Sequence, residues 1–423
     1  MKQIIKKGSF LTLMFMLLGC LSLYAADNDL ITKQITIELE KAGTLPDRIA
    51  SSKKYKITNL KIIGEINGTD LWMIRDMAGG NNTDGKLSVL DLSEAKIVKG
   101  GGYYYKDGED DWSDRYKYYT SNDVIGDYAF RGCSGLTSLT LPAGITKIGG
   151  SAFEDCSGLT SLNLPAGITE IGSGAFYGCS GLTSLNLPAS ITKIGGSAFK
   201  GCSGLTSLNL PASITKIGDS AFEGCSGLTS LNLPAGITEI SGDAFSGCSG
   251  LTSLTLPAGI TSIGSGAFYG CSGLTSLNLP AGITSIGFGA FYGCSGLTSL
   301  TLPAGITKIG GSAFSGCSGL TSIYVYAEKV PKIGSNVFEG VDAKKCTLYV
   351  PMGTRDDYWL SGFGDYIENI VEFEATGIDK TTTSTDVEEV ARYSVNGQRL
   401  SVPTKGLNIV KYSDGSVKKV AVR

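Results

Sequence analysis

The chain has 423 residues, a net charge of −3 and no histidine. The lack of a strongly basic balance argues against nucleic acid as the main partner. Without histidine, and without any Cys-x-x-Cys pair, a zinc site is not expected and the cysteines lack a catalytic base. The composition therefore favours a protein that is not an enzyme and that holds no cofactor or metal.

Residues 1–25 have the pattern of a signal peptide. Three lysines among the first seven residues precede an apolar run from Leu11 to Leu18, which is too short for a comfortable membrane span. Two processing sites fit this leader: ordinary cleavage after Ala25, or a bacterial lipobox that would lipidate Cys20. Both place the protein at the cell surface or outer membrane, or outside the cell. A membrane contact is expected only through a lipid or sorting anchor.

Residues 26–122 are expected to form an N-terminal cap. Irregular strand patterns begin at Ile57 and Leu87, and a helical pattern runs between them from Thr69 to Met77. A stacked array needs such a cap, because its first unit would otherwise expose an apolar face to water.

The segment from Gly100 to Asn122 interrupts this cap with tyrosines among acidic residues. Loops often carry function, and Tyr and Trp are favoured in recognition surfaces. The candidate ligand contacts of this segment are Tyr103, Tyr104, Tyr105, Trp112, Tyr116, Tyr118 and Tyr119. The alternative is an insertion packed along the flank, with its tyrosines covering an apolar edge. A calcium loop does not fit, because Trp112 and Tyr118 stand where glycine and glutamate are needed.

Residues 123–374 are expected to form a repeat array with a C-terminal cap, and one unit repeats with few changes as far as Ser322. Nine cysteines stand 23 residues apart from Cys133 to Cys317, and a phenylalanine stands three residues before each. A strict period of this length predicts a solenoid, mostly β-strand and turn, whose units bury their apolar faces only against neighbours. The strand pattern predicts a curved parallel sheet of about twelve strands between Ile57 and Val350.

The repeated cysteines point to the same side of every coil, into the core. Buried thiols that act as small apolar groups fit this spacing. Disulfides between adjacent coils are the alternative, because the chain has an export signal.

Alternation along each strand sends leucines inward and polar residues to the concave face. One outward column is serine, and the other is mostly asparagine or threonine; its candidate ligand contacts are Asn163, Asn186, Asn209, Asn232, Asn278 and Tyr324. This neutral surface suits hydrogen bonding to glycans or to a protein, and the alternative is a soluble sheet face without a ligand. A candidate aromatic patch on adjacent coils comprises Tyr269, Phe288 and Tyr292.

Beyond the last repeat, a short helix from Asp356 to Trp359 is expected to close the core. Residues 375–388 are polar and are typical of a linker. Residues 389–423 predict a small β module, since Asn396-Gly397 and Asp414-Gly415 are typical hairpin turns.

The coil pattern I-x-x-I-G-x-x-A-F-x-x-C-x-x-L-x-x-L-x-L-P resembles the BspA-like class of bacterial leucine-rich repeats, of the type found in Bacteroidetes. The tail is similar to sorting modules of the type IX secretion route. The resemblance implies a leucine-rich-repeat solenoid and a surface or secreted protein that binds host or bacterial surface proteins or glycans. Two alternatives remain open: a surface spacer or coat protein without a ligand, and a lipid-anchored protein that captures glycans. Nothing in the resemblance indicates the oligomeric state.

Overall fold

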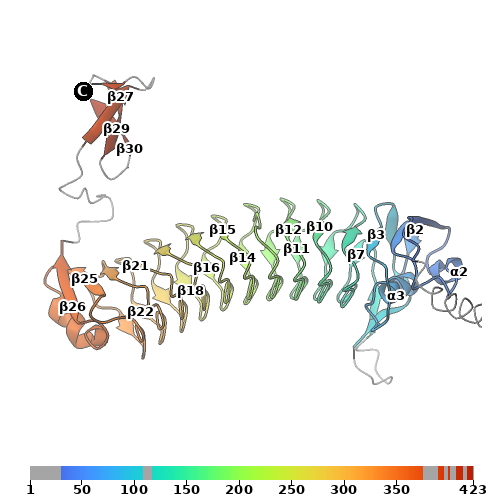
Figure 1. Cartoon of the computed structure of the whole chain (residues 1–423), viewed down its shortest axis with the longest axis horizontal. Coiled ribbons are helices and arrows are strands. Elements are labelled where there is room, and N and C mark those ends of the chain that lie inside the picture. The colour runs from blue at the N-terminus through green and yellow to red at the C-terminus, as the bar shows by residue number, and fades with distance from the viewer. Residues whose placement is uncertain are drawn as a thin grey trace, which may run out of the picture. The chain divides into compact units, whose positions relative to one another are not determined.

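The structure is a computed structural model that describes residues 30–107 and 117–374, and four strands between residues 389 and 422. It divides at Phe373 into a large unit and a small C-terminal one (Figure 1). The signal peptide with Cys20, the segment with Trp112 and Tyr116, and the expected linker lie outside the described residues.

The large unit is a parallel β-solenoid, as the 23-residue period predicts. Its main ladder takes one strand from each coil and forms two seven-stranded sheets. The first contains β1 (Ile35–Leu39), β2 (Asn59–Ile66), β3 (Val89–Asp91), β8 (Ser138–Thr140), β10 (Ser161–Asn163) and β12 (Ser184–Asn186), with β4 (Ala95–Ile97) beside β2. The second contains β15 (Ser230–Asn232), β17 (Ser253–Thr255), β19 (Ser276–Asn278), β21 (Ser299–Leu302), β23 (Ser322–Val325), β25 (Thr347–Pro351) and β26 (Asn369–Phe373). Equivalent residues of successive coils pair directly, as Leu162 does with Leu185.

A second parallel ladder, built from two-residue strands, runs along another side of the coils. One part contains β7 (Val124–Ile125), β9 (Lys147–Ile148), β11 (Glu170–Ile171), β13 (Lys193–Ile194) and β14 (Lys216–Ile217). The other contains β16 (Glu239–Ile240), β18 (Ser262–Ile263), β20 (Ser285–Ile286), β22 (Lys308–Ile309) and β24 (Lys332–Ile333). In nearly every strand the isoleucine is buried and the residue before it faces solvent, at least in part.

The core is a stack of identical side chains. From Phe130 to Phe314 the phenylalanine rings of neighbouring coils lie parallel, with centroids 5.2–5.5 Å apart. Beside them each cysteine from Cys156 to Cys317 donates its S–H to the carbonyl oxygen of the phenylalanine in the preceding coil, at 3.0–3.2 Å. The described cysteines are all buried and unpaired. Each of these carbonyl oxygens also accepts the backbone N–H of the cysteine in its own coil, so the thiol column adds a second donor and links neighbouring coils.

The main ladder is interrupted at one coil, and the second ladder breaks at the interface between that coil and the next. Residues 207–209 form no strand, and β14 does not pair with β16. Ser241 stands here in place of the glycine that follows the isoleucine pair in other coils; a Cβ on the equivalent Gly218 or Gly264 would lie 2.5–2.7 Å from backbone of the preceding coil. The Ser241 hydroxyl instead donates to the Ile217 carbonyl oxygen at 2.7 Å. The phenylalanine stack continues through this seam.

The N-terminal cap combines two helices and a hairpin. Helix α2 (Leu45–Arg48) and helix α3 (Gly68–Met77) precede the antiparallel strands β5 (Gly100–Lys106) and β6 (Lys117–Thr120). The side chain of Asn67 caps α3, and the buried Asp70 carboxylate accepts the backbone N–H groups of Gly43 and Leu45. The cap thus gives its own helix ends the partners that the array cannot supply.

At the other end, α4 (Arg355–Tyr358) and a π-helical turn (Trp359–Phe363) cover the last coil, as expected from the sequence. Tyr358 and Phe363 are buried, and the Tyr358 hydroxyl donates to the Ala327 carbonyl oxygen at 2.6 Å. This polar contact lets an aromatic residue close the core without an unpaired hydroxyl.

The small unit is an antiparallel sheet in the order β28-β27-β29-β30. Its strands are β27 (Glu389–Ser394), β28 (Arg399–Leu400), β29 (Gly406–Tyr412) and β30 (Val417–Val422). No helix in the described part of the chain is long and apolar enough to cross a membrane.

Candidate recognition surfaces

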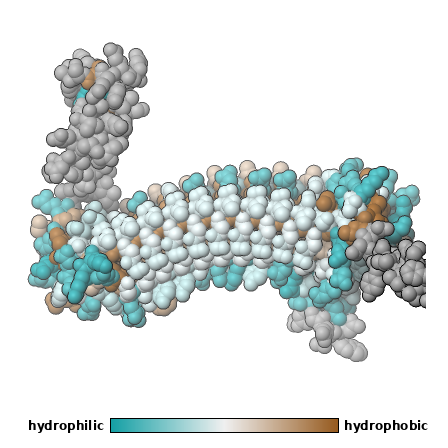
Figure 2. Space-filling view, in the orientation of Figure 1, coloured by the Kyte–Doolittle hydropathy of each residue, from teal (hydrophilic) through white to brown (hydrophobic). Residues whose placement is uncertain are grey.

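The outward side of the main ladder, here called the sheet face, carries columns of small polar side chains. Ser161 pairs with Ser184, and Asn163 with Asn186, in direct register. The five asparagines of the column are all exposed, including Asn209 in the coil without a strand. On the side of the molecule that Figure 2 shows, the array has an even surface of intermediate hydropathy, whereas the caps carry hydrophilic and hydrophobic patches.

Tyr324 belongs to an aromatic cluster at the C-terminal end of the same face. Its ring stacks on Tyr349 with centroids 4.4 Å apart, and Phe373 lies edge-on to Tyr326 at 5.2 Å. Burial raises the pKa of the Tyr324 hydroxyl above its ordinary value. Tyr324 is thus only partly available at the end of the column.

Tyr269, Phe288 and Tyr292 lie on an outer corner of adjacent coils. The two tyrosine rings stack in parallel with centroids 4.8 Å apart, and they are 47% and 39% exposed. Phe288, at 64% exposure, stands where other coils have aspartate, serine or glycine. A Cβ on Gly311 would lie 3.4 Å from the Phe288 ring, so that ring leans over the next coil.

The described part of the tyrosine-rich segment belongs to the cap, which corrects the expectation for Tyr104. Tyr104 is buried and its hydroxyl donates to the Asp127 carbonyl oxygen at 2.7 Å, so it is not available to a ligand. Tyr105 and Tyr118 are partly buried and pack on Tyr128, with ring centroids 4.9 and 4.8 Å away. These rings therefore pack on the edge of the first regular coil.

Among the described tyrosines of the segment, two others are at least partly exposed to solvent. Tyr119 is exposed, and Tyr103 is half-buried at the start of the hairpin. Tyr103 lines one cavity and Tyr105 lines a second one, and neither cavity was expected from the sequence.

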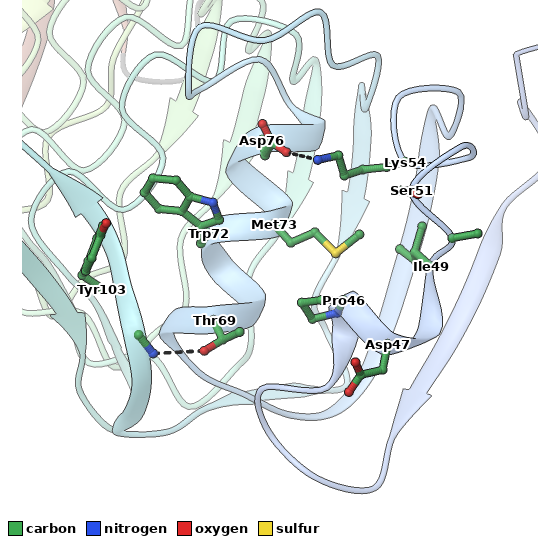
Figure 3. Close-up of a pocket in the computed structure, with 12 residues that line it drawn as sticks. Pro46, Asp47, Ile49, Ser51, Lys54, Thr69, Trp72, Met73, Asp76 and Tyr103 are labelled. Atoms are coloured by element: carbon green, nitrogen blue, oxygen red, sulfur yellow. Dashed lines mark hydrogen bonds and ion pairs between the residues drawn. The ribbon is translucent and has the colours of Figure 1, made fainter.

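The first cavity, of about 610 Å³, lies between helix α3, the chain from Pro46 to Lys54 and the first residues of β5 (Figure 3). Trp72 and Tyr103 form one wall, with their rings perpendicular at 88° and centroids 5.4 Å apart. Met73 and Ile49 are buried beneath it. The one sequence feature that could have pointed to this cavity is Trp72, a large apolar residue beside polar residues of a helix.

Two carboxylates and one ammonium group lie at the edge of this cavity. The Lys54 Nζ pairs with the Asp76 carboxylate, which also accepts the Tyr55 hydroxyl at 3.1 Å. Its hydrogen bond to Asp76 raises the pKa of Lys54 above the ordinary value. Asp47 is exposed in the first turn of α2. The edge therefore offers a fixed ion pair and one further acceptor.

A buried arginine joins the cap to the array. Arg75 on α3 is fully buried, and its guanidinium donates to the carbonyl oxygens of Tyr128, Ala129 and Gly80 at 2.7, 3.1 and 3.0 Å. Its charge lies 4.9 Å from the centre of the Tyr105 ring. Burial lowers the pKa of Arg75 below its ordinary value. The first regular coil thus obtains hydrogen-bond donors from a helix of the cap.

The core thiols have little nucleophilic reactivity near neutral pH. Burial raises the pKa of Cys133 to about 11 and the pKa values of Cys179 and Cys248 to about 12. A thiol with such a pKa holds almost no thiolate near neutral pH, and the thiolate is the nucleophile. Within the described residues no group of side chains could hold a metal ion.

The architecture defines a class: a parallel solenoid of leucine-rich repeats with a cap at each end. Residues 123–252 and 238–354 match the BspA type leucine rich repeat region, with six copies, and this match spans more than half of the chain. The chain therefore belongs to the BspA-type leucine-rich repeat family.

Solved structures of bacterial repeat proteins resemble this chain. A leucine-rich repeat protein from Bacteroides ovatus is 29% identical, with 62% of this chain and 69% of that chain covered and a TM-score of 0.52. A leucine rich cell surface protein from Faecalibacterium prausnitzii is 28% identical over 51% of this chain and 69% of its own, with a TM-score of 0.40. A search of curated proteins gave no match.

Proposed function

We propose that this protein is an exported surface protein that recognises host or bacterial surface proteins or glycans through its sheet face. One observation carries the proposal: the exposed side-chain amides of the asparagine column make no hydrogen bond to any described part of the chain, although most of their backbones pair in the ladder. By contrast, the threonine hydroxyls before each strand donate to the preceding coil, as Thr160 does to the Thr137 carbonyl oxygen at 3.2 Å.

The unused amides repeat at the spacing of parallel strands, about 4.8 Å. Each amide has two donors and an acceptor, and each neighbouring serine adds a hydroxyl. A ligand with evenly spaced polar groups can therefore bind at several coils at once, and weak single contacts add up through multivalency. This geometry favours extended polymers such as glycans or long extracellular proteins.

The test replaces asparagines with a residue that other coils already carry. The variant Asn186→Thr, Asn209→Thr, Asn232→Thr and Asn278→Thr copies the threonine found at Thr140, Thr255 and Thr301, so the fold is expected to persist. Binding of the mature chain to immobilised matrix proteins and mucin glycans is expected to fall at least tenfold.

The matched control changes the other ladder. Lys216→Ser and Glu239→Ser copy Ser262 and Ser285, and they are expected to leave binding unchanged. If the wild-type protein bound nothing on the panel, the array would be a spacer or coat component and the proposal would fail.

Export is part of the proposal. The leader would be cleaved after Ala25, and residues 389–423 would serve as a sorting module. Mass spectrometry of the protein from its native cells tests both points. A free N-terminus at Ala26 is expected, and a lipid on Cys20 would instead indicate a lipid-anchored protein.

A further inference from the structure

The N-terminal cap holds a hollow that its packing does not require. Met73 and Ile49 are buried at its base, yet Trp72 beside them is 40% exposed. A tryptophan that only filled the cap would turn its ring inward, because its apolar area is large. The volume of about 610 Å³ falls within the usual range of small-molecule sites, about 300–1,000 Å³.

Trp72 borders a second hollow as well, of about 540 Å³, which is lined by Tyr105, Arg131 and the turn at Gly80–Asn82. In Figure 3 the indole of Trp72 stands beside Tyr103, and Met73 extends toward Pro46 and Ile49. The Trp72 backbone is held by the Asn81 side chain, which donates to its carbonyl oxygen at 3.3 Å. The exposed indole thus borders both hollows, so a ligand longer than one ring could contact it from either hollow.

We propose that this cap cavity binds a short neutral oligosaccharide, with a sugar ring against Trp72. A sugar presents C–H groups on its ring faces and hydroxyls on its edge, and the cavity offers the matching pair of surfaces: an exposed indole and a fixed Lys54–Asp76 ion pair with Asp47. Hydrogen bonds to charged groups are stronger than those between neutral groups. This inference deepens the proposed recognition function by naming one class of ligand at a separate site.

The charges that line the cavity favour some sugars over others. Among the side chains that line this cavity, Asp47 and Asp76 are the two carboxylates and Lys54, already paired with Asp76, is the one cation; the whole chain carries a net charge of −3. A uronic or sialic acid would bring another negative charge into this surrounding and would be repelled. Neutral hexoses and N-acetylhexosamines are therefore favoured over acidic sugars.

The experiment uses the mature chain and saturation-transfer NMR with β-linked glucose, α-linked glucose and N-acetylglucosamine trisaccharides, and with an oligouronate of equal length. At least one neutral trisaccharide is expected to bind, and the oligouronate more weakly or not at all. Trp72→Ala is expected to weaken binding at least tenfold. The matched control is Trp359→Ala, which removes a similarly exposed tryptophan, 47% exposed, at the other cap.

A second variant tests the cavity without removing a side chain that packs in the cap. Ala50→Trp adds bulk at an exposed position on the rim without removing any contact, and it is expected to abolish binding with an unchanged circular dichroism spectrum. The proposal is overturned if no neutral trisaccharide binds at millimolar concentration, if Trp72→Ala binds normally, or if the oligouronate or a peptide competes better. The four-asparagine variant of the sheet face is expected to bind the trisaccharide normally, so failure here and failure of the proposed function are distinguishable.

Discussion

The repeat array and the N-terminal cap provide partners for their buried groups in opposite ways. In the array, every buried ring, thiol and carbonyl finds an identical group one coil away, as Phe176 does in Phe199. The cap has no such neighbour, so it uses single residues: Arg75 for the carbonyls, Asp70 for free N–H groups and Tyr104 for the apolar edge. The array therefore repeats one set of contacts in every coil, whereas each contact in the cap depends on a residue that occurs once.

The largest expected effect tests the uniformity of the array. Phe176→Ala and Phe268→Ala should each lower the free energy of unfolding by about 3–5 kcal/mol, because each removes a buried ring and leaves a cavity. The two losses should be equal within error, since both rings stack between two others. Urea unfolding followed by circular dichroism measures them.

Tyr177→Ala serves as the control for those variants, because Tyr177 is exposed one residue after Phe176. It should cost less than about 1 kcal/mol. Clearly unequal losses for the two phenylalanines would show that the coils are not energetically equivalent.

The next prediction tests the cap. Arg75→Met keeps the apolar stem but removes the donors for three backbone carbonyls, and it should cost about 2–4 kcal/mol. Arg48→Met, at an exposed position of α2, is the control. Hydrogen exchange should rise first at residues 125–133, next to the cap. A stability equal to that of the control would mean that water satisfies these carbonyls.

The raised pKa values of the buried thiols predict that the free energy of unfolding depends on pH. Their pKa values in the folded protein lie above the ordinary value of 9.0, so folding disfavours the thiolate. The stability that they supply is complete below pH 9 and is lost as the pH rises toward 12, by about 1.4 kcal/mol per pH unit for each thiol.

The double variant Cys179→Ala and Cys248→Ala should therefore flatten the fall in unfolding free energy above pH 9. Urea unfolding at pH 8, 9.5 and 10.5 gives the slope. Tyrosines and lysines contribute equally in both proteins, so the difference reports the thiols. An identical slope would argue that these two thiols ionise without unfolding.

The smallest effect concerns the seam inside the array. Ser241→Gly should restore the backbone hydrogen bond from residue 241 to the Ile217 carbonyl and stabilise the array by about 1 kcal/mol. The reverse change, Gly264→Ser, should create a second seam and destabilise it by a similar amount, because a Cβ there would lie 2.7 Å from the Gly242 nitrogen. Thermal unfolding of the pair measures both; equal shifts in the same direction would contradict the explanation.

Much of the array could be predicted from the sequence. The period placed Leu162 and Cys156 inside and Asn163 outside, since a strand alternates and each coil repeats its neighbour. The second ladder was not predicted, because a two-residue strand leaves no alternation to detect. The gap at residues 207–209 was missed too, since this coil carries the same Ser-Leu-Asn triplet as its neighbours.

The candidate sites were less predictable. The tyrosine-rich segment suggested a binding loop by composition alone, yet Tyr104 is buried and Tyr105 leans on Tyr128. Composition does not tell which side of a hairpin faces the core. The cavity beside Trp72 joins residues from three separate segments, and no spacing in the sequence connects them.

By itself the sequence determined the solenoid, its core columns and its polar face, because each of these depends on neighbours at a fixed distance along the chain. Only the tertiary structure decided how the ends are closed: Arg75 as donor to the first regular coil, the tyrosines as cover, and the cavity between α3 and the residues after α2. Those features arise from single contacts between distant segments, and such contacts leave no periodic trace in a sequence.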